Sequence, residues 1–192
     1  MSKSLATATP RIIERVITVL QAKLETELAA IGAPVQLYLP SPANHAYFSI
    51  PEEARLDEPM VHNTAVYVYP STIRRTIQRR LQGPTEYGST TEVGVAVVVA
   101  FRMAPQDVFQ YFDKTITTAE IMQLRAHYYN AGVIETLLKY GINPDDINDL
   151  ILEEEQGAVS FIEGRELGGI AYSSWTMTQD TRLPVPQIGA VP

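Results

Sequence analysis

The chain has no cysteine among its 192 residues. Disulfide bonds, thiolate zinc sites and cysteine nucleophiles are therefore excluded. Basic residues are also scarce, because 15 lysines and arginines stand against 22 aspartates and glutamates, which gives a net charge of -7. Nucleic-acid binding by a whole surface needs an excess of positive charge, so any contact of this protein with nucleic acid is expected to be local.

Long apolar runs are missing too. The longest, at residues 93–101, has the length of a strand and falls far short of the roughly 18 apolar residues of a membrane-spanning helix, so no membrane partner is expected. Hydrophobic residues make up 45% of the chain and charged residues 19%, which excludes a disordered chain. We expect one domain over residues 1–181 and an extended tail at 182–192, which holds three prolines.

A first helix is expected over residues 10–31. Thr9 is placed to cap its amides, Pro10 suits its first position, and Gly32 follows the last periodic residue as a stop. Apolar residues recur every three or four positions, which predicts a single stripe that packs on a sheet or on another helix. That stripe consists of Ile13, Val16, Ile17, Leu20, Leu24, Leu28 and Ile31.

A second long helix is expected to follow Thr117 and to end near Tyr140. Thr117 and Glu120 have the spacing of a capping box, and Gly141 marks the end of the helix. Its apolar residues include Ile121, Leu124, Tyr128, Ala131 and Leu138.

A third, short helix is expected over residues 144–152. Asn143 is a good capping residue, Pro144 suits the first helical position, and two aspartates follow that complement the helix dipole. Residues 153–156, which include three glutamates, are expected to form a solvated break.

Strands are expected where apolar and polar residues alternate between turn residues. The expected strands are residues 35–39, 46–50, 64–69, 92–103, 158–162 and 169–178. The strand at 64–69 is expected to stop at Pro70. The pattern is clearest at 92–103, where large side chains occupy one face and smaller ones the other. The last two strands flank a glycine-containing hairpin loop.

Residues 71–83 are ambiguous, because the spacing of their apolar residues allows a helix and a strand alike. This segment holds four of the fifteen bases of the chain, namely Arg74, Arg75, Arg79 and Arg80. Turn-prone residues 82–89 follow, and Glu86 and Tyr87 are among them. We expect a protruding arm, similar to a β-hairpin, over about residues 71–92.

The order of elements is helix, strands, long helix, short helix and closing strands. Consecutive strands joined by turns predict a mainly antiparallel sheet. Two long helices that each carry an apolar stripe are expected to cover one face of it. The predicted fold class is therefore α+β.

No catalytic motif is present, and we expect no enzyme activity, no metal and no cofactor. The three histidines, His45, His62 and His127, have no partner at a recurring metal-ligand spacing. The serine pair at 173–174 lacks the setting of a nucleophile elbow, and the glycines of residues 164–169 do not open a helix.

The arginines of the arm allow two interpretations. They form either a patch that contacts phosphate or a partner, or the solvated face of an exposed element. The acidic total charge favours a protein partner. A neighbouring subunit could supply it through acidic residues of the loop at 51–63, namely Glu52, Glu53, Asp57 and Glu58.

Several segments together resemble a known family. They are the amphipathic helix at 11–17, the strand at 66–69, the arm through Arg80, the long strand at 92–102, the helix with tyrosines 128 and 129, and the late strand at 171–175. This layout resembles the tail terminator, or tail completion, proteins of long-tailed bacteriophages. The chain departs from shorter members by an insertion around residues 41–63 and by its proline-rich end.

The resemblance implies a structural protein of the virion tail and neck, assembled in the host cytoplasm. It implies a hexameric ring of identical subunits that caps the tail tube, ends tail polymerisation and joins the tail to the head-side connector. The tube protein, a sheath in contractile tails, and the connector are the implied partners. DNA passes through the lumen without specific binding, so the arginines are expected to face protein.

Two other classes remain open. A head-side connector or another neck protein would share the structural role. A small-molecule-binding or enzymatic α+β domain would instead use a pocket between sheet and helices, lined by Tyr128, Tyr129, Tyr172 and Trp175.

Overall fold

The computed structural model describes residues 7–32, 46–49, 64–78, 86–103, 109–111, 114–143, 146–162 and 166–184. In chain order, the elements are α1 (Ala8–Ala30), β1 (Ala46–Phe48), β2 (Thr64–Gln78), β3 (Glu86–Met103), β4 (Phe109–Tyr111), β5 (Lys114–Ile116), α2 (Thr118–Tyr140), β6 (Asp149–Ile162) and β7 (Glu166–Pro184). The segment expected as a strand at 35–39 lies outside the described residues.

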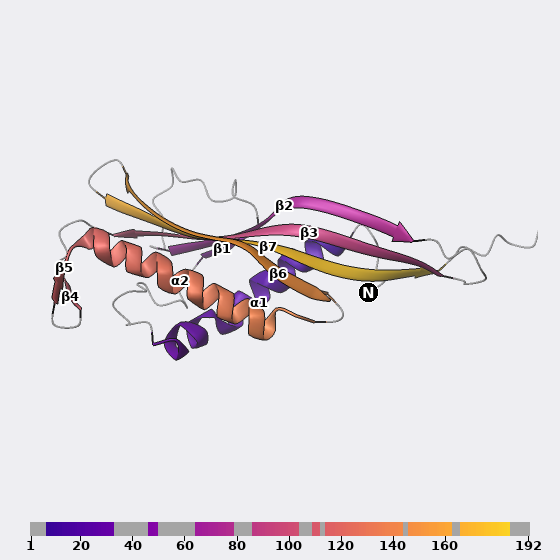
Figure 1. Cartoon of the computed structure of the whole chain (residues 1–192), viewed down its shortest axis with the longest axis horizontal. Coiled ribbons are helices and arrows are strands. Elements are labelled where there is room, and N and C mark those ends of the chain that lie inside the picture. Colours follow the sequence, from indigo (N-terminus) through magenta and orange to yellow (C-terminus); the bar gives the residue numbers. More distant parts are fainter. Residues whose placement is uncertain are drawn as a thin grey trace, which may run out of the picture.

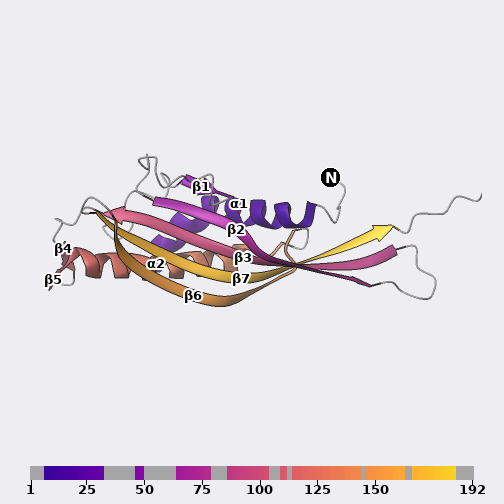
Figure 2. The same ribbon diagram turned by 90° about the horizontal axis from the view of Figure 1, so that it is seen from above.

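Five strands form one sheet in the order β1-β2-β3-β7-β6, and β4 and β5 form a separate hairpin. Every neighbouring pair of the large sheet is antiparallel except β1 and β2, which are parallel. Both helices lie on the same side of this sheet (Figure 1), and Figure 2 shows the strands in their order from above. The prediction of a mainly antiparallel α+β fold with two helices on one face is confirmed.

The alternation in β3 decides which face is the core. Its large side chains at odd positions are buried and belong to the hydrophobic core beneath the helices: Val93, Val95, Val97, Val99 and Phe101. The residues between them point to the other face, which neither helix covers. We call this second face the uncovered face of the sheet.

Helix α1 ends as the sequence predicts and begins two residues earlier. Gly32 follows the helix with a φ of 73°, a left-handed conformation that favours glycine. The N-cap is Thr7, so the prediction that Thr9 caps the helix is wrong. Thr9 and Pro10 lie in the first turn, where a proline is tolerated because the amides there lack helical partners. The predicted stripe is confirmed, with Ile17 and Ile31 only partly buried.

Helix α2 has the predicted capping box at Thr117 and Glu120, but its buried face is rotated from the predicted one. Leu138 is 56% exposed, and Leu124 and Tyr128 are half-buried. The apolar residues that enter the core are Ile121, Met122, Ala126, Tyr129, Val133 and Leu137. Apolar residues occur around most of this helix, so spacing alone does not select the face that packs.

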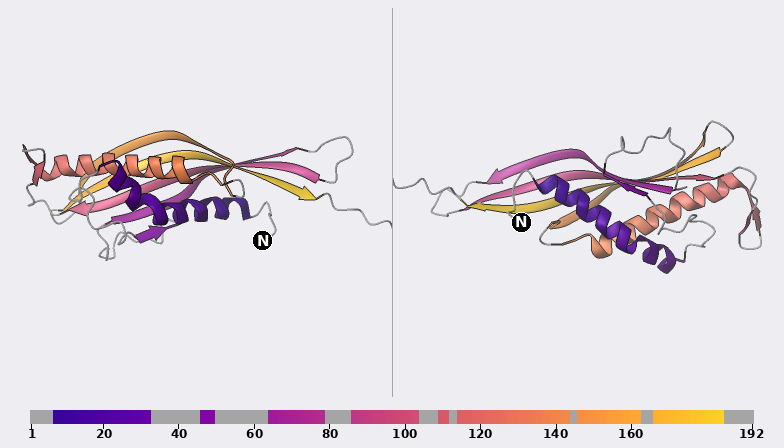
Figure 3. Two further views of the ribbon diagram at one scale, coloured as in Figure 1. Left: turned by 90° about the horizontal axis from the view of Figure 1, so that it is seen from below. Right: turned by 180° about the vertical axis from the view of Figure 1, so that it is seen from behind.

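Two glycines allow close packing of the layers. A Cβ on Gly132 of α2 would lie 2.6 Å from Cδ2 of Leu28, so α1 and α2 cross in close contact (Figure 3). A Cβ on Gly169 of β7 would lie 2.3 Å from the ring of Phe101. That ring in turn packs against Tyr129, with 5.4 Å between the ring centroids.

The end of α2 is held to α1 by a polar cluster. Glu27 is buried, and its carboxylate accepts hydrogen bonds from Lys139 Nζ at 2.6 Å and from the Tyr140 hydroxyl at 3.0 Å. The hydrogen bond from Lys139 lowers the pKa of Glu27, and the same bond raises the pKa of Lys139. Arg15 donates through Nη2 to the carbonyl of Tyr140 at 2.8 Å, where a cation complements the helix C-terminus.

The prediction of a short helix at 144–152 is wrong. Asn143 and Ile147 instead close a tight turn through an isolated β-bridge, and the amide of Ile147 also donates to the carbonyl of Asn143 at 2.7 Å. Strand β6 then begins at Asp149 and continues through residues 153–156, which were expected to be a solvated break. Asparagine, proline and aspartate favour turns as well as helix starts. Here the pairing of β6 with β7 favours the turn over the helix.

Candidate assembly surface

The arm is a three-stranded extension of the sheet. Past the bulge, β2 pairs with β3 from Thr72 to Gln78, and β3 pairs with β7 out to Pro184. The row of Ile73, Val93 and Met177 still borders the core. Figures 1 and 2 show these three strands continuing past the helices. The ambiguous segment after Pro70 is therefore a strand. The predicted arm has a third strand, because Arg182 to Pro184, which were expected to begin the tail, still pair with β3.

Two register shifts mark the place where the arm leaves the body. One lies between Pro70 and Thr72 in β2, and the other lies between Leu152 and Glu154 in β6, near the same level of the sheet. Bulges of this kind increase the local twist and bend the strand. Gly94 on β3 faces the first bulge, and a Cβ there would lie 2.4 Å from Oγ1 of Thr72. The missing side chain therefore lets the bulged strand pack closely.

Charged and hydroxyl side chains line the uncovered face of the arm. Arg74 lies directly opposite Glu92, and their nearest charged atoms are 3.7 Å apart. Two residue pairs closer to the tip of the arm, the Thr90 hydroxyl donates a hydrogen bond to Oδ1 of Asp180 at 2.7 Å. The Arg74 side chain is 80% exposed, so this ion pair contributes little to stability and leaves the guanidinium open to a partner.

The opposite face of the arm is apolar and buried at its base, at Val93 and Met177, and becomes polar farther out. Ser89, Thr91 and Gln179 are buried there, although all three are polar. Ile73 lies on the same face and is 57% exposed. On this face the exposed apolar surface of the arm is therefore contributed by the outer strand β2, at Ile73.

The structure describes only part of the predicted site. Arg74 and Arg75 are exposed on the arm as expected. Glu86 and Tyr87 begin β3, with their backbones paired to Pro184 and Leu183. The other predicted residues, Arg79, Arg80, Glu52, Glu53, Asp57 and Glu58, lie outside the described residues. Their pairing across subunits stays a prediction.

Sequence reasoning missed the partner that Arg74 has within its own chain. Glu92 comes to lie opposite Arg74 because the two strands pair over their whole length. No local pattern signals this contact, because the register of β2 against β3 depends on the bulge after Pro70.

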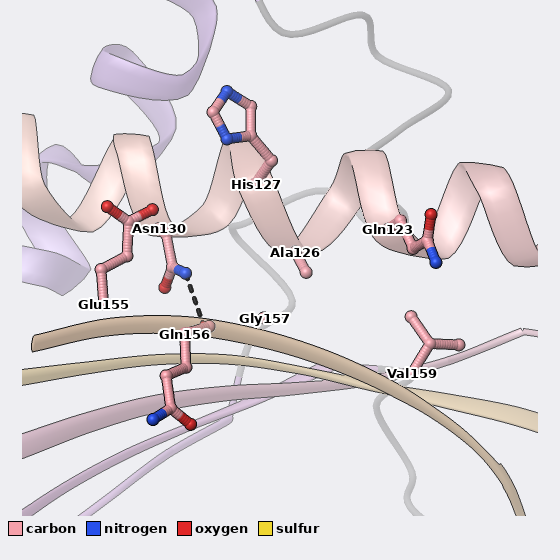
Figure 4. Close-up of a pocket in the computed structure, with 8 residues that line it drawn as sticks. All are labelled: Gln123, Ala126, His127, Asn130, Glu155, Gln156, Gly157 and Val159. Carbon is pink, nitrogen blue, oxygen red and sulfur yellow. Dashed lines mark hydrogen bonds between the residues drawn. The ribbon is translucent and has the colours of Figure 1, made fainter.

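A solvent-open hollow of about 180 Å³ lies between α2 and β6 (Figure 4). Its lining residues are Gln123, Ala126, His127, Asn130, Glu155, Gln156, Gly157 and Val159. Asn130 donates through Nδ2 to the carbonyl of Gln156 at 2.7 Å, and a Cβ on Gly157 would lie 3.2 Å from that of Ala126. Ligand pockets usually have about 300–1,000 Å³, so we interpret this hollow as a helix–strand junction.

The aromatic residues expected to line a ligand pocket do not meet. Tyr129 and Trp175 are buried in the core, where the Trp175 indole donates to the Ser173 hydroxyl at 2.9 Å. Tyr172 points to the uncovered face of the sheet, and Tyr128 is half-buried on α2. The pocket expected from these four residues is therefore not formed.

The part of the chain that the structure describes offers neither a metal site nor a membrane-spanning helix. Among the described residues, no group of three or more histidines and acidic residues is placed to hold a metal ion. His127 is exposed and packs edge-on against Tyr128, while His45 and His62 lie outside the described part of the chain. Neither helix has the length and apolar character that crossing a membrane requires.

Comparisons with known proteins give remote structural likenesses alone. No protein-family model matches the sequence, and no curated protein matches it. Among 24 solved chains that match the fold is one from the structure titled "Virion of native gene transfer agent (GTA) particle". The two chains are 13% identical, and the alignment covers 83% of this chain and 93% of that one with a TM-score of 0.32. At these values the likeness establishes no shared function.

Proposed function

We propose that this protein is a structural virion protein that forms a ring of identical subunits on the tail tube of a long-tailed phage. The ring, a hexamer by the family resemblance, ends tube polymerisation and joins the tail to the head-side connector. One observation carries the proposal, namely the three-stranded arm that runs beyond the helices covering the rest of the sheet.

The arm supports assembly because its outer strand adds exposed surface next to the core. Its outer strand exposes Ile73 together with Arg74 and Arg75. A closed ring needs two different complementary surfaces on each subunit, since the contact is head to tail. An arm that reaches past the body can supply one of them to the neighbouring subunit.

The total charge supports a lumen that lets DNA slide. The protein has a net charge of -7, so the negative charge of a ring grows with the number of its subunits. Fixed cations that faced the bore would add a salt-dependent attraction to DNA. Arginines that face protein in the ring avoid this attraction.

The first test is the assembly state of the full-length protein. We expect light scattering after size-exclusion chromatography to give a mass several times 21.3 kDa, and negative-stain microscopy to show rings with a central opening. Mass spectrometry of purified virions from the source phage is expected to find the chain. A protein that stays monomeric at all concentrations and is absent from virions contradicts the proposal.

A gene disruption separates the terminator from other neck proteins. Without a terminator, tube polymerisation has no stop, so we expect abnormally long tails that are not joined to heads. Without a head-side connector alone, tails keep their normal length and stay detached. Electron microscopy of the lysate distinguishes these outcomes, and normal tailed particles would contradict both roles.

A further inference from the structure

The large sheet has an unpaired stretch on each of its two outer edges. On one side, β1 covers β2 only at Ala65 to Tyr67, and no described strand pairs with the outer edge of β2 from Val68 onward. On the other side, no described strand pairs with the outer edge of β6. Unpaired edges present rows of backbone donors and acceptors that can pair with another chain.

The unpaired stretches of the two edges lie at the same level of the sheet. On β6, α2 packs closely from Gln156 onward, where Asn130 binds the carbonyl of Gln156, which leaves residues 149–155. The residue pairs across β3 and β7 define rows that run from β2 to β6. Val68 and Glu155 lie in one such row, and Arg74 and Asp149 lie in another. The stretches 68–74 and 149–155 therefore match in position and extent.

The two edges also carry opposite charge. Acidic side chains line the unpaired stretch of β6, and Asp149 and the glutamates at 153–155 are all exposed. The end of β2 that is level with Asp149 carries the exposed Arg74 and Arg75, while the glutamates are level with residues 68–71. Each edge also exposes one isoleucine, Ile73 on the face of the sheet that carries the helices and Ile151 on the uncovered face. Backbone pairing and a pair of opposite charges are thus available together.

Strand direction fits as well. Because β2, β3, β7 and β6 alternate in direction, β6 runs antiparallel to β2 within one subunit. A second copy placed beside the first in the same orientation presents its β2 antiparallel to the first copy's β6. The alternation of the sheet then continues from one subunit into the next.

We propose that the β2 edge at residues 68–74 of one subunit pairs with the β6 edge at residues 149–155 of the next, with Arg74 beside Asp149. This inference deepens the proposed ring function, since it names the two surfaces by which neighbouring subunits meet. In this register, Ile73 comes beside Leu150 on the face of the sheet that carries the helices.

The charges select a head-to-tail contact over a symmetric one. Two β6 edges brought together would place acidic residues against acidic residues, and two β2 edges would offer the arginines no acidic partner on the edge. Like charges across paired strands are unfavourable, whereas opposite charges are favourable. A contact between two different edges leaves one edge free on each new subunit, so growth continues until a ring closes.

Cysteine cross-linking tests the register directly, because the chain has no cysteine of its own. Within one subunit, Arg74 and Asp149 are separated by two strands, or about 14 Å at about 4.8 Å per strand, which is too far for a disulfide. We expect R74C/D149C to form a ladder of covalent multimers on a non-reducing gel. Reductant should return the ladder to monomer.

Three variants control this experiment. Each single variant, R74C or D149C, has one thiol and is expected to give no species beyond a dimer. T72C/I151C lies in the same register, leaves every charge in place and is expected to give a ladder as well. T76C/D149C is two residues out of register and is expected to cross-link far more slowly.

A charge reversal supplies a second measurement. D149R should weaken self-association by about threefold to tenfold, and added salt should weaken that of the unmodified protein. The matched control is E14R, which makes the same change of charge on an exposed position of α1. Equal effects of D149R and E14R would contradict the proposed contact.

The outcomes separate this inference from the proposed function. Rings that form normally while neither in-register cysteine pair cross-links overturn the edge contact and leave the ring function standing. A covalent ladder from a protein whose gene disruption leaves normal tailed particles supports the edge contact and overturns the terminator function.

Discussion

Glu27 makes the stability of the contact between α1 and α2 depend on pH. Its carboxylate is buried, and the hydrogen bond from Lys139 lowers its pKa below the ordinary value of 4.5. A carboxyl whose pKa is lowered by folding contributes stability that is complete above its unfolded pKa. That contribution is lost as the pH falls through the folded value, so the link between α1 and α2 weakens in acid.

We therefore expect E27Q to lower the thermal midpoint at about pH 7, and the difference from the unmodified protein to shrink towards about pH 3. Scanning calorimetry or circular dichroism at several pH values measures this. E14Q, an exposed change on the same helix, is expected to alter neither value. A difference between E27Q and the unmodified protein that does not change with pH would argue against this role.

Gly132 sets how closely the helices approach. A Cβ there would meet Cδ2 and Cγ of the buried Leu28 at 2.6 and 2.9 Å. G132A gains helix propensity, yet we expect overpacking to dominate, with a net loss of about 1–2 kcal/mol in the free energy of unfolding. Denaturant unfolding measures it. The control is G88A on the arm. A Cβ added at Gly88 would have no neighbouring atom within 4 Å, so no comparable loss of stability is expected.

At the scale of elements, the capping box of α2 is the clearest local signal in the chain. The Glu120 amide donates to Thr117 Oγ1 at 3.3 Å, and the Thr117 amide donates to Glu120 Oε2 at 2.6 Å. We expect T117A to cost about 1 kcal/mol of stability. T18A, an exposed change within α1, is expected to be neutral or slightly stabilising, so equal effects would contradict the capping argument.

Elements defined by local signals were predictable from sequence, and elements defined by pairing were not. The strand at 92–103 was found because it is buried on one face, so its side chains alternate. Most of the side chains that the structure describes in β6 are exposed on both faces, which erases the alternation and made its glutamates look like a break. The segment after Pro70 was ambiguous for a similar reason, since only its register with β3 makes it a strand.

At the scale of the whole molecule, the fold class and the arm followed from the sequence, but the candidate site followed only in part. The exposure of Arg74 was predictable from its charge. The third strand of the arm, the contact of Arg74 with Glu92 and the acidic edge at 149–155 all depend on pairings between segments distant in sequence. No local pattern records those pairings.

The place of β7 in the sheet has a consequence for the timing of assembly. It is synthesised after every other strand that the structure describes, yet it lies between β3 and β6. A ribosome that has completed β6 has therefore made a strand that cannot yet join the sheet, because its only described neighbour is still missing. The two edges come to lie at opposite sides of one sheet only after β7 is inserted, so the edge of β6 is completed last.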